Sequence, residues 1–138
     1  MAIFFHEEGV RTGLKKKRVL KAWMKEVILR EKRIPGNINI VFTTDKKLGG
    51  MNQEFLSRDY YTDILTFDYS ENEIISGDLY ISLERVRENA SKFKEPVERE
   101  LMRVMIHGLL HILGYGDSKD EEKKNMRLAE DRYLNLIE

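Results

Sequence analysis

The sequence predicts an α/β (α+β) protein, with a single small mixed β-sheet of about four strands packed with about five helices. Stretches with apolar residues at helical spacing alternate with short runs rich in β-branched and aromatic residues. The length of 138 residues suits one domain and is too short for two, so we expect residues 1–138 to fold as a single domain. Hydrophobic residues make up 41% and charged residues 35%, which is typical of soluble globular proteins.

The first third of the chain predicts a helix, a strand and a short helix. Residues 14–30 are expected to be helical, because their apolar residues recur at spacings of three and four, and Pro35-Gly36 ends this region. Residues 37–42 alternate and then run apolar, which predicts a strand with one buried face. Asp45 is a suitable cap for a short helix that reaches Phe55. The apolar stripe of the first helix consists of Leu20, Trp23, Met24, Val27 and Ile28.

The middle of the chain predicts two strands and one helix. Residues 64–67 and 79–82 are short and rich in β-branched and aromatic residues, as strands commonly are. A helical stretch follows, which begins at Ser82 or Glu84 and extends to the region of Phe93. Together with residues 37–42, the two strands supply the sheet that the helices cover.

The last third predicts two helices. Pro96 suits the first turn of a helix, and residues 97–113 are the most apolar helical stretch of the chain. Gly114 follows, and glycine is the usual residue of a left-handed helix end. Residues 118–121 fit a capping box that begins a last helix, which extends to the region of residue 136. The stripe of the first of these helices contains Leu101, Val104, Met105, Leu109 and Ile112.

The composition excludes several classes of protein. The absence of cysteine excludes a disulfide scaffold, a thiolate metal site and a cysteine nucleophile. No apolar run approaches 18 residues, so we expect no membrane span and no membrane partner. The segment 1–8 becomes acidic too early for a signal peptide, which favours a cytoplasmic location. The sequence leaves the oligomeric state open.

The net charge of the whole chain is zero, but basic residues are concentrated in one segment. The 24 basic and 24 acidic residues cancel, whereas the segment Arg11–Arg33 contains ten Lys or Arg and two Glu. A basic region on a neutral protein favours contact with phosphates, and a solvated helix face is the alternative interpretation. Within this segment, the candidate contacts to an RNA backbone are Lys15, Lys16, Lys17 and Arg18.

Two histidines and an aspartate predict a metal site at the end of the central helix. His107 and His111 are four residues apart, which places both imidazoles on one face of a helix. Gly114 ends the helix, so Asp117 can return a carboxylate to the same point. Three such ligands leave a further position open, as catalytic zinc sites do. A hydrogen-bonded histidine pair and a helix-capping aspartate are the alternatives.

The spacing matches the His-x3-His-x2-Gly-x2-ligand frame of metzincin peptidases. In those enzymes a glutamate directly after the first histidine acts as general base, and this chain has Gly108 there. A metal ion can itself acidify bound water, so hydrolysis with another base stays possible. A metallopeptidase remains an alternative that Gly108 disfavours.

The motif resembles the signature of the YbeY-type endoribonucleases. The resemblance implies a zinc-dependent, single-strand-specific endoribonuclease that acts in late maturation of ribosomal RNA, at the 3′ end of 16S RNA, and in ribosome quality control. It implies ribosomal RNA and the small ribosomal subunit as partners, and one zinc or other transition-metal ion per chain. The segments that carry it are His107–Tyr115, Met51–Phe55, Asp59–Phe67, Gly77–Ser82 and Met126.

The chain departs from the family pattern at two positions. Asp117 stands where the family usually has a third histidine ligand, and an oxygen ligand suits harder metal ions as well as zinc. Leu56 stands where the family has an arginine implicated in activity, and Arg58 is the candidate to replace it. The predicted catalytic residues are therefore His107 and Arg58. A ribosome-associated binding module with a structural metal is the remaining alternative.

Overall fold

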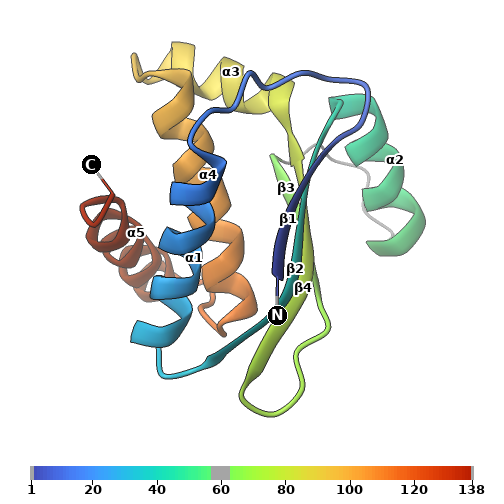
Figure 1. Ribbon diagram of the computed structural model, residues 1–138. Helices are drawn as coiled ribbons and strands as arrows, with labels where there is room; N and C mark the ends of the chain where they lie inside the picture. Colours follow the sequence, from blue (N-terminus) through green and yellow to red (C-terminus); the bar gives the residue numbers. More distant parts are fainter. Residues whose placement is uncertain (1, 57–62, 138) are drawn as a thin grey trace.

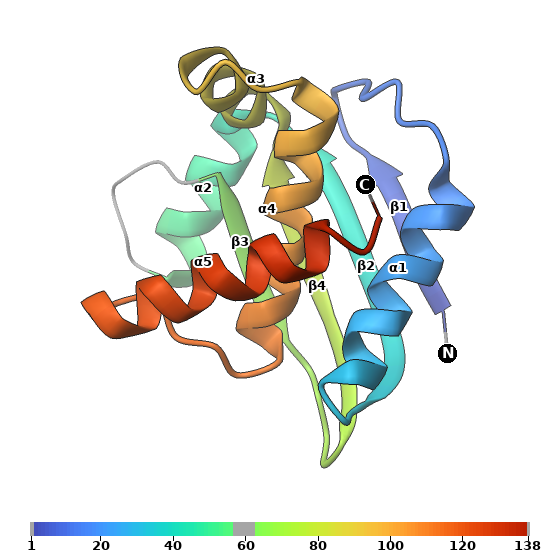
Figure 2. The same cartoon turned by 90° about the vertical axis from the view of Figure 1, so that its left-hand side faces the viewer.

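The computed structural model describes residues 2–56 and 63–137, of which residues 53–56 are described by their backbone alone. This part of the chain contains a sheet of four strands and five helices, which confirms the predicted α/β class (Figures 1 and 2). In chain order the elements are β1 (Ala2–Glu7), α1 (Lys17–Arg30), β2 (Ile34–Thr43), α2 (Asp45–Leu56), β3 (Ile64–Asp68), β4 (Ile74–Ser82), α3 (Leu83–Lys92), α4 (Val97–Ile112) and α5 (Asp120–Leu134).

The sheet is mixed and has the strand order β1-β2-β4-β3. The β1–β2 and β2–β4 pairs are parallel, and the β3–β4 pair is antiparallel. Helices α1, α4 and α5 lie on one side of the sheet, and α2 lies on the other (Figure 1). Among the described helices, none has both the length and the apolar composition that a membrane crossing requires.

The core lies between the sheet and the two amphipathic helices that the sequence predicts. The whole predicted stripe of α1 is buried, and so is that of α4. Helix α4 lies between the sheet and α5, so its buried face is unusually wide. The indole Nε1–H of Trp23 donates a hydrogen bond of 2.7 Å to the carbonyl of Tyr133, which ties α1 to α5. Helix α4 itself packs against β3, β4, α3 and α5.

Gly77 in β4 permits a close approach between the sheet and the end of α4. A Cβ atom at this position would lie 2.5 Å from the carbonyl oxygen of Phe67 and 2.8 Å from Cδ1 of Ile112. The carbonyl belongs to the neighbouring strand and cannot move without disturbing the β3–β4 pairing. Only glycine fits at this position. The contact matters for the site because Ile112 directly follows the predicted ligand His111.

Gly77→Ala is expected to destabilise the protein by about 1–3 kcal/mol, because it overpacks a rigid contact. Gly50→Ala is the matched control, since Gly50 is a helical glycine at which an added Cβ atom would meet nothing within 4 Å. That change should leave stability unchanged or raise it by up to about 1 kcal/mol through helix propensity. Urea unfolding of both variants measures the difference. Equal stability of Gly77→Ala and the parent would contradict the contact.

The strands are longer than the sequence predicts, and β1 lies outside the residue ranges that were expected to be strands. Strand β4 begins at Ile74 instead of residue 79. Strand β2 begins at Ile34 and so includes Pro35, which the sequence suggested as a breaker. A register irregularity between Pro35 and Ile38 absorbs the missing donor, as bulges commonly do.

The start of α5 differs from the predicted capping box by one residue. The carboxylate that caps it belongs to Glu122, and Oε1 accepts hydrogen bonds from the Lys119 N–H at 3.0 Å and the Ser118 hydroxyl at 2.9 Å. The helix begins at Asp120 as a result. In these contacts Glu122, and not Asp117, caps α5, so the helix-capping alternative for Asp117 is disfavoured.

Candidate metal centre

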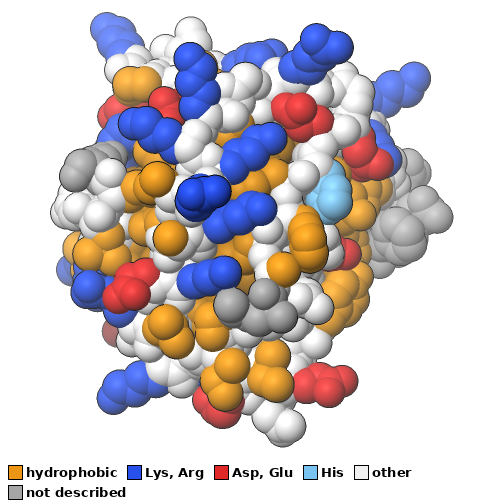
Figure 3. Space-filling model, viewed as in Figure 1, with side chains coloured by type: hydrophobic (Ala, Val, Ile, Leu, Met, Phe, Trp, Pro, Cys, Tyr) orange, Lys and Arg blue, Asp and Glu red, His pale blue; other side chains and the backbone are white. Residues whose placement is uncertain are grey.

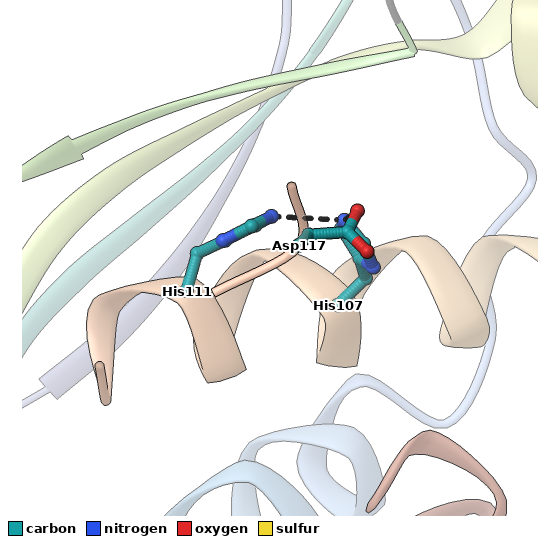
Figure 4. A group of neighbouring side chains, drawn as sticks. All are labelled: His107, His111 and Asp117. Atoms are coloured by element: carbon teal, nitrogen blue, oxygen red, sulfur yellow. Dashed lines mark hydrogen bonds and ion pairs between the residues drawn. The ribbon is translucent and has the colours of Figure 1, made fainter. Parts of the chain in front are cut away.

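The three predicted ligands lie together at the end of α4. His107, His111 and Asp117 each offer one ligand atom, and these atoms lie within 4.8 Å of one another. Nε2 of His107 is 3.0 Å from Nε2 of His111 and 3.5 Å from Oδ2 of Asp117 (Figure 4). The two imidazoles rise from one face of the helix, and the carboxylate comes from the loop that follows it. The three side chains thus form a group that could hold one metal ion.

A tight turn after α4 returns the chain to the histidines. Gly114 has a φ of 104°, in the left-handed region that glycine adopts without strain. Its N–H donates to the carbonyl of His111 at 3.0 Å, and the N–H of Tyr115 donates to the carbonyl of Leu110 at 2.9 Å. These two bonds define a Schellman motif, which satisfies the last carbonyls of the helix. The turn brings Tyr115 and Asp117 back over the imidazoles.

Both imidazoles are oriented by hydrogen bonds at Nδ1. The Nδ1–H of His111 donates to the carbonyl of Tyr115 at 3.1 Å, and that of His107 donates to Oε2 of Glu130 at 2.6 Å. This assignment of tautomers follows from the acceptors, since neither oxygen can donate. Each Nε2 is then left with its lone pair toward the centre of the group, as metal-binding histidines require.

Glu130, which holds His107 from α5, was not predicted from the sequence. Glu130 is 4% exposed, and its second oxygen accepts a hydrogen bond of 2.9 Å from Arg103. Arg103 also donates to the exposed carboxylate of Asp131 at 2.9 Å. One signal was available: Glu130 lies four residues after Met126, on the buried face of an amphipathic helix, where a carboxylate needs a partner.

The charges of the group depend strongly on Glu130. Burial alone would lower the pKa of His107, but the hydrogen bond and negative charge of Glu130 outweigh it and raise that pKa. Burial and the neighbouring His107 lower the pKa of His111. Burial would raise the pKa of Glu130, and its bonds to His107 and Arg103 lower it instead. Glu130 is therefore a carboxylate at neutral pH, fixed between the imidazole of His107 and the guanidinium of Arg103.

The donor set fits a transition-metal ion. With both Nδ1 atoms acting as donors, two Nε2 lone pairs would face each other at 3.0 Å, which is repulsive unless a cation or a proton lies between them. The carboxylate of Asp117 beside them adds an anionic oxygen. Two imidazole nitrogens and one carboxylate oxygen are a common ligand set of zinc and related metals. His107, His111 and Asp117 can thus bind a metal ion.

Gly108 has no space for the general base of a metallopeptidase. Gly108 is buried against the sheet, where a Cβ atom would collide with Cδ1 of Ile64 and lie 3.2 Å from Cδ2 of Leu79. The residue after His107 therefore faces the core instead of the metal group. A glutamate at this position would need the sheet and α4 to separate, so the geometry disfavours the peptidase alternative.

A cavity of about 330 Å³ opens beside the metal group, between α3, α4 and α5. His107 and Asp117 line it, and its walls carry charges of both signs: Lys123 and Arg127 from α5, and the carboxylates of Asp63, Glu100 and Glu130. A phosphate that enters next to the predicted metal ligands can therefore meet a cation only on the α5 side. Neither Lys123 nor Arg127 was predicted from the sequence as a site residue.

The predicted basic residues Lys15, Lys16, Lys17 and Arg18 are all exposed and lie at the start of α1. None of them lines the cavity at the metal group. Basic side chains gather over α1 and the loop before it on the face drawn in Figure 3. The structure thus separates this basic surface from the metal group.

Arg58, the remaining predicted site residue, lies outside the described residues, as does the side chain of Leu56.

Fold and site together define a class of protein in which a His-x3-His helix and the following turn present a metal group beside a small mixed sheet. A family model described as Endoribonuclease YbeY matches residues 7–138. Endoribonuclease YbeY of Flavobacterium psychrophilum is 51% identical over 115 residues, which are 83% of this chain and 82% of the relative. That of Phocaeicola vulgatus is 45% identical over 135 residues, 98% of each chain. The chain belongs to the YbeY endoribonuclease family.

A solved structure has the same fold. The solution structure of TM1509 from Thermotoga maritima matches with a TM-score of 0.69 and 29% sequence identity. The match covers 99% of this chain and 89% of that chain. The family resemblance that the sequence motifs indicated is confirmed over almost the whole length by the family model and the relatives.

Asp117→Ala is expected to weaken metal binding by at least ~100-fold, more than the loss of a residue that only orients a ligand. Asp117→His, which supplies a nitrogen ligand, should restore most of the affinity. Competition with a fluorescent chelator measures both. Asp120→Ala is the control, because Asp120 is an exposed carboxylate at the start of α5. Parental affinity in Asp117→Ala would show that Asp117 is not a ligand.

Proposed function

We propose that this protein is a metal-dependent endoribonuclease that cleaves single-stranded RNA. Its relatives carry the name Endoribonuclease YbeY, and the metal group beside a cavity that Lys123 and Arg127 line is the observation that carries the proposal. We place its action in late maturation of ribosomal RNA, at the 3′ end of 16S RNA, and in ribosome quality control. The proposed partners are ribosomal RNA and the small ribosomal subunit. The proposed location is the cytoplasm, and residues 1–138 are proposed to form one hydrolase domain.

His107, His111 and Asp117 are the proposed ligands of one zinc ion, with another transition metal as an acceptable substitute. When bound, the ion supplies a Lewis acid that polarises a phosphoryl oxygen and acidifies water. Glu130 holds the proton on Nδ1 of His107, so that Nε2 stays available as a ligand. The carbonyl of Tyr115 does the same for His111. These two contacts fix the ligands before substrate arrives.

An RNA phosphodiester carries its own nucleophile, the 2′-hydroxyl, so cleavage requires orientation and charge stabilisation from the protein. Lys123 and Arg127 line the cavity and are suited to hold the phosphate that enters it. Arg58 is proposed as a further catalytic cation. Lys15, Lys16, Lys17 and Arg18 are proposed to attract more distant phosphates of the same strand, a contribution that salt would weaken.

The proposal is tested by incubating the purified protein with three labelled substrates: a single-stranded RNA, the same RNA annealed to its complement, and casein. We expect cleavage of the single strand, little cleavage of the duplex, no cleavage of casein, and loss of activity in EDTA. Cleavage of casein alone would favour a metallopeptidase. RNA binding without cleavage by metal-loaded protein would favour a binding module and contradict the nuclease.

A further inference from the structure

Glu100 is a buried carboxylate that the metal group does not use. It is 8% exposed and lines the cavity at the metal group. Among the described residues, none makes a hydrogen bond or an ion pair with its carboxylate. The guanidinium of Arg103, which lines the same cavity, is occupied by Glu130 and Asp131. A mostly buried carboxylate that lines a cavity is suited to accept hydrogen bonds from a ligand that enters it.

The position of Glu100 excludes direct action on the scissile bond. Glu100 and His107 lie on one face of α4, and seven residues of helix place them about 10 Å apart along its axis. A proton-transferring group must come within about 3 Å of the atom it serves. With the reacting phosphate at the metal group, a group about 10 Å away is at a suitable distance for the nucleoside next to that phosphate.

The other walls of the cavity offer what a nucleoside needs. Phe93, at the end of α3, lines the cavity and is 60% exposed, so its ring is available for stacking on a base. Lys123 and Arg127 stand along the α5 side, where they can meet a phosphate. The volume of about 330 Å³ is within the range of small-ligand sites.

We propose that this cavity is the subsite for the nucleoside that flanks the scissile phosphate, and that Glu100 selects guanine there. The proposal rests on the proposed nuclease function. A carboxylate only accepts hydrogen bonds, and guanine presents two adjacent donors, N1–H and the N2 amino group, that match its two oxygens. Adenine and cytosine offer one amino group each beside an acceptor. Uracil presents two carbonyl oxygens around a single donor, which makes it the least suitable base.

The test measures binding of the four nucleoside 5′-monophosphates to the metal-loaded protein by calorimetry. An endonuclease has no internal bond to cleave in these probes. The parent should bind the guanosine nucleotide most tightly and the uridine nucleotide most weakly. Glu100→Gln should lose at least tenfold affinity for the guanosine nucleotide and little for the uridine nucleotide. Glu98→Gln is the control, since Glu98 is an exposed carboxylate on the same helix, away from this cavity.

The outcomes separate the subsite from the nuclease and from a structural role. Equal binding of the four nucleotides by the parent, or unchanged selectivity in Glu100→Gln, would overturn the subsite. Base selectivity without RNA cleavage would keep the subsite and overturn the proposed nuclease. Glu100→Gln should unfold at or above the parental temperature, because a neutral amide is less costly to bury. A lowered unfolding temperature with unchanged selectivity would assign Glu100 a structural role instead.

Discussion

His111→Ala is expected to reduce the bound metal from about one ion per chain to near none, because three protein ligands become two. RNA cleavage should fall by at least ~100-fold, since a Lewis acid at a phosphoryl oxygen is worth several kcal/mol. Metal content by mass spectrometry of the purified variant, and cleavage of a labelled single-stranded RNA, measure the two effects. The fold should survive, because His111 is partly exposed at the end of its helix.

His6→Ala is the matched control for this change. His6 is the one histidine of the chain besides His107 and His111. It lies in β1, where its Nε2 is 3.0 Å from Oδ1 of Asn39. It lines neither the metal group nor the cavity beside it. His6→Ala should keep both the metal and the activity. A fully loaded His111→Ala protein would refute the assignment of the site.

Glu130→Ala is expected to destabilise the metal-free protein by about 3 kcal/mol, because it leaves Arg103 buried without its inner partner. The side chain of Arg103 is only 11% exposed, and the remaining partner, Asp131, is 51% exposed. Metal affinity should also fall about 10–100-fold, since His107 loses the acceptor that orients it. Urea unfolding in EDTA and chelator competition measure the two losses separately.

As a control, Asp131→Ala removes the exposed partner of the same arginine and should lower stability by less than about 1 kcal/mol.

The loss of stability in Glu130→Ala should also depend on pH. The pKa of Glu130 is held below its ordinary value of 4.5 in the folded protein. Its stabilising contribution is therefore present above pH 4.5 and disappears as the pH falls through the lowered value. Equal destabilisation by Glu130→Ala and Asp131→Ala at neutral pH would contradict the buried network.

The helices were predictable because their signals are local. The apolar stripes of α1 and α4 are repeated every three or four residues, and each stripe is buried as predicted. Strand β1 has one buried residue, Ile3, and pairs with β2, from which it is separated in sequence by the whole of α1. Such a parallel edge strand depends on a partner distant in sequence, which no local pattern reveals.

The same distinction divides the site. His107, His111 and Asp117 could be predicted because one helical turn and one glycine turn bring them together. Glu130 lies 23 residues from His107 and reaches it only through the packing of α5 on α4. Helix packing likewise decides which cations reach the cavity, and the basic residues of α1 do not line it.

The most direct test of the account is an RNA cleavage assay in which zinc is returned stepwise to protein stripped with EDTA. If His107, His111 and Asp117 form a single functional site, activity should rise in proportion to added zinc and level off at about one equivalent per chain. The stripped protein should have no activity. Cleavage that persists at the parental rate after stripping would contradict the central claim that this metal group carries the reaction.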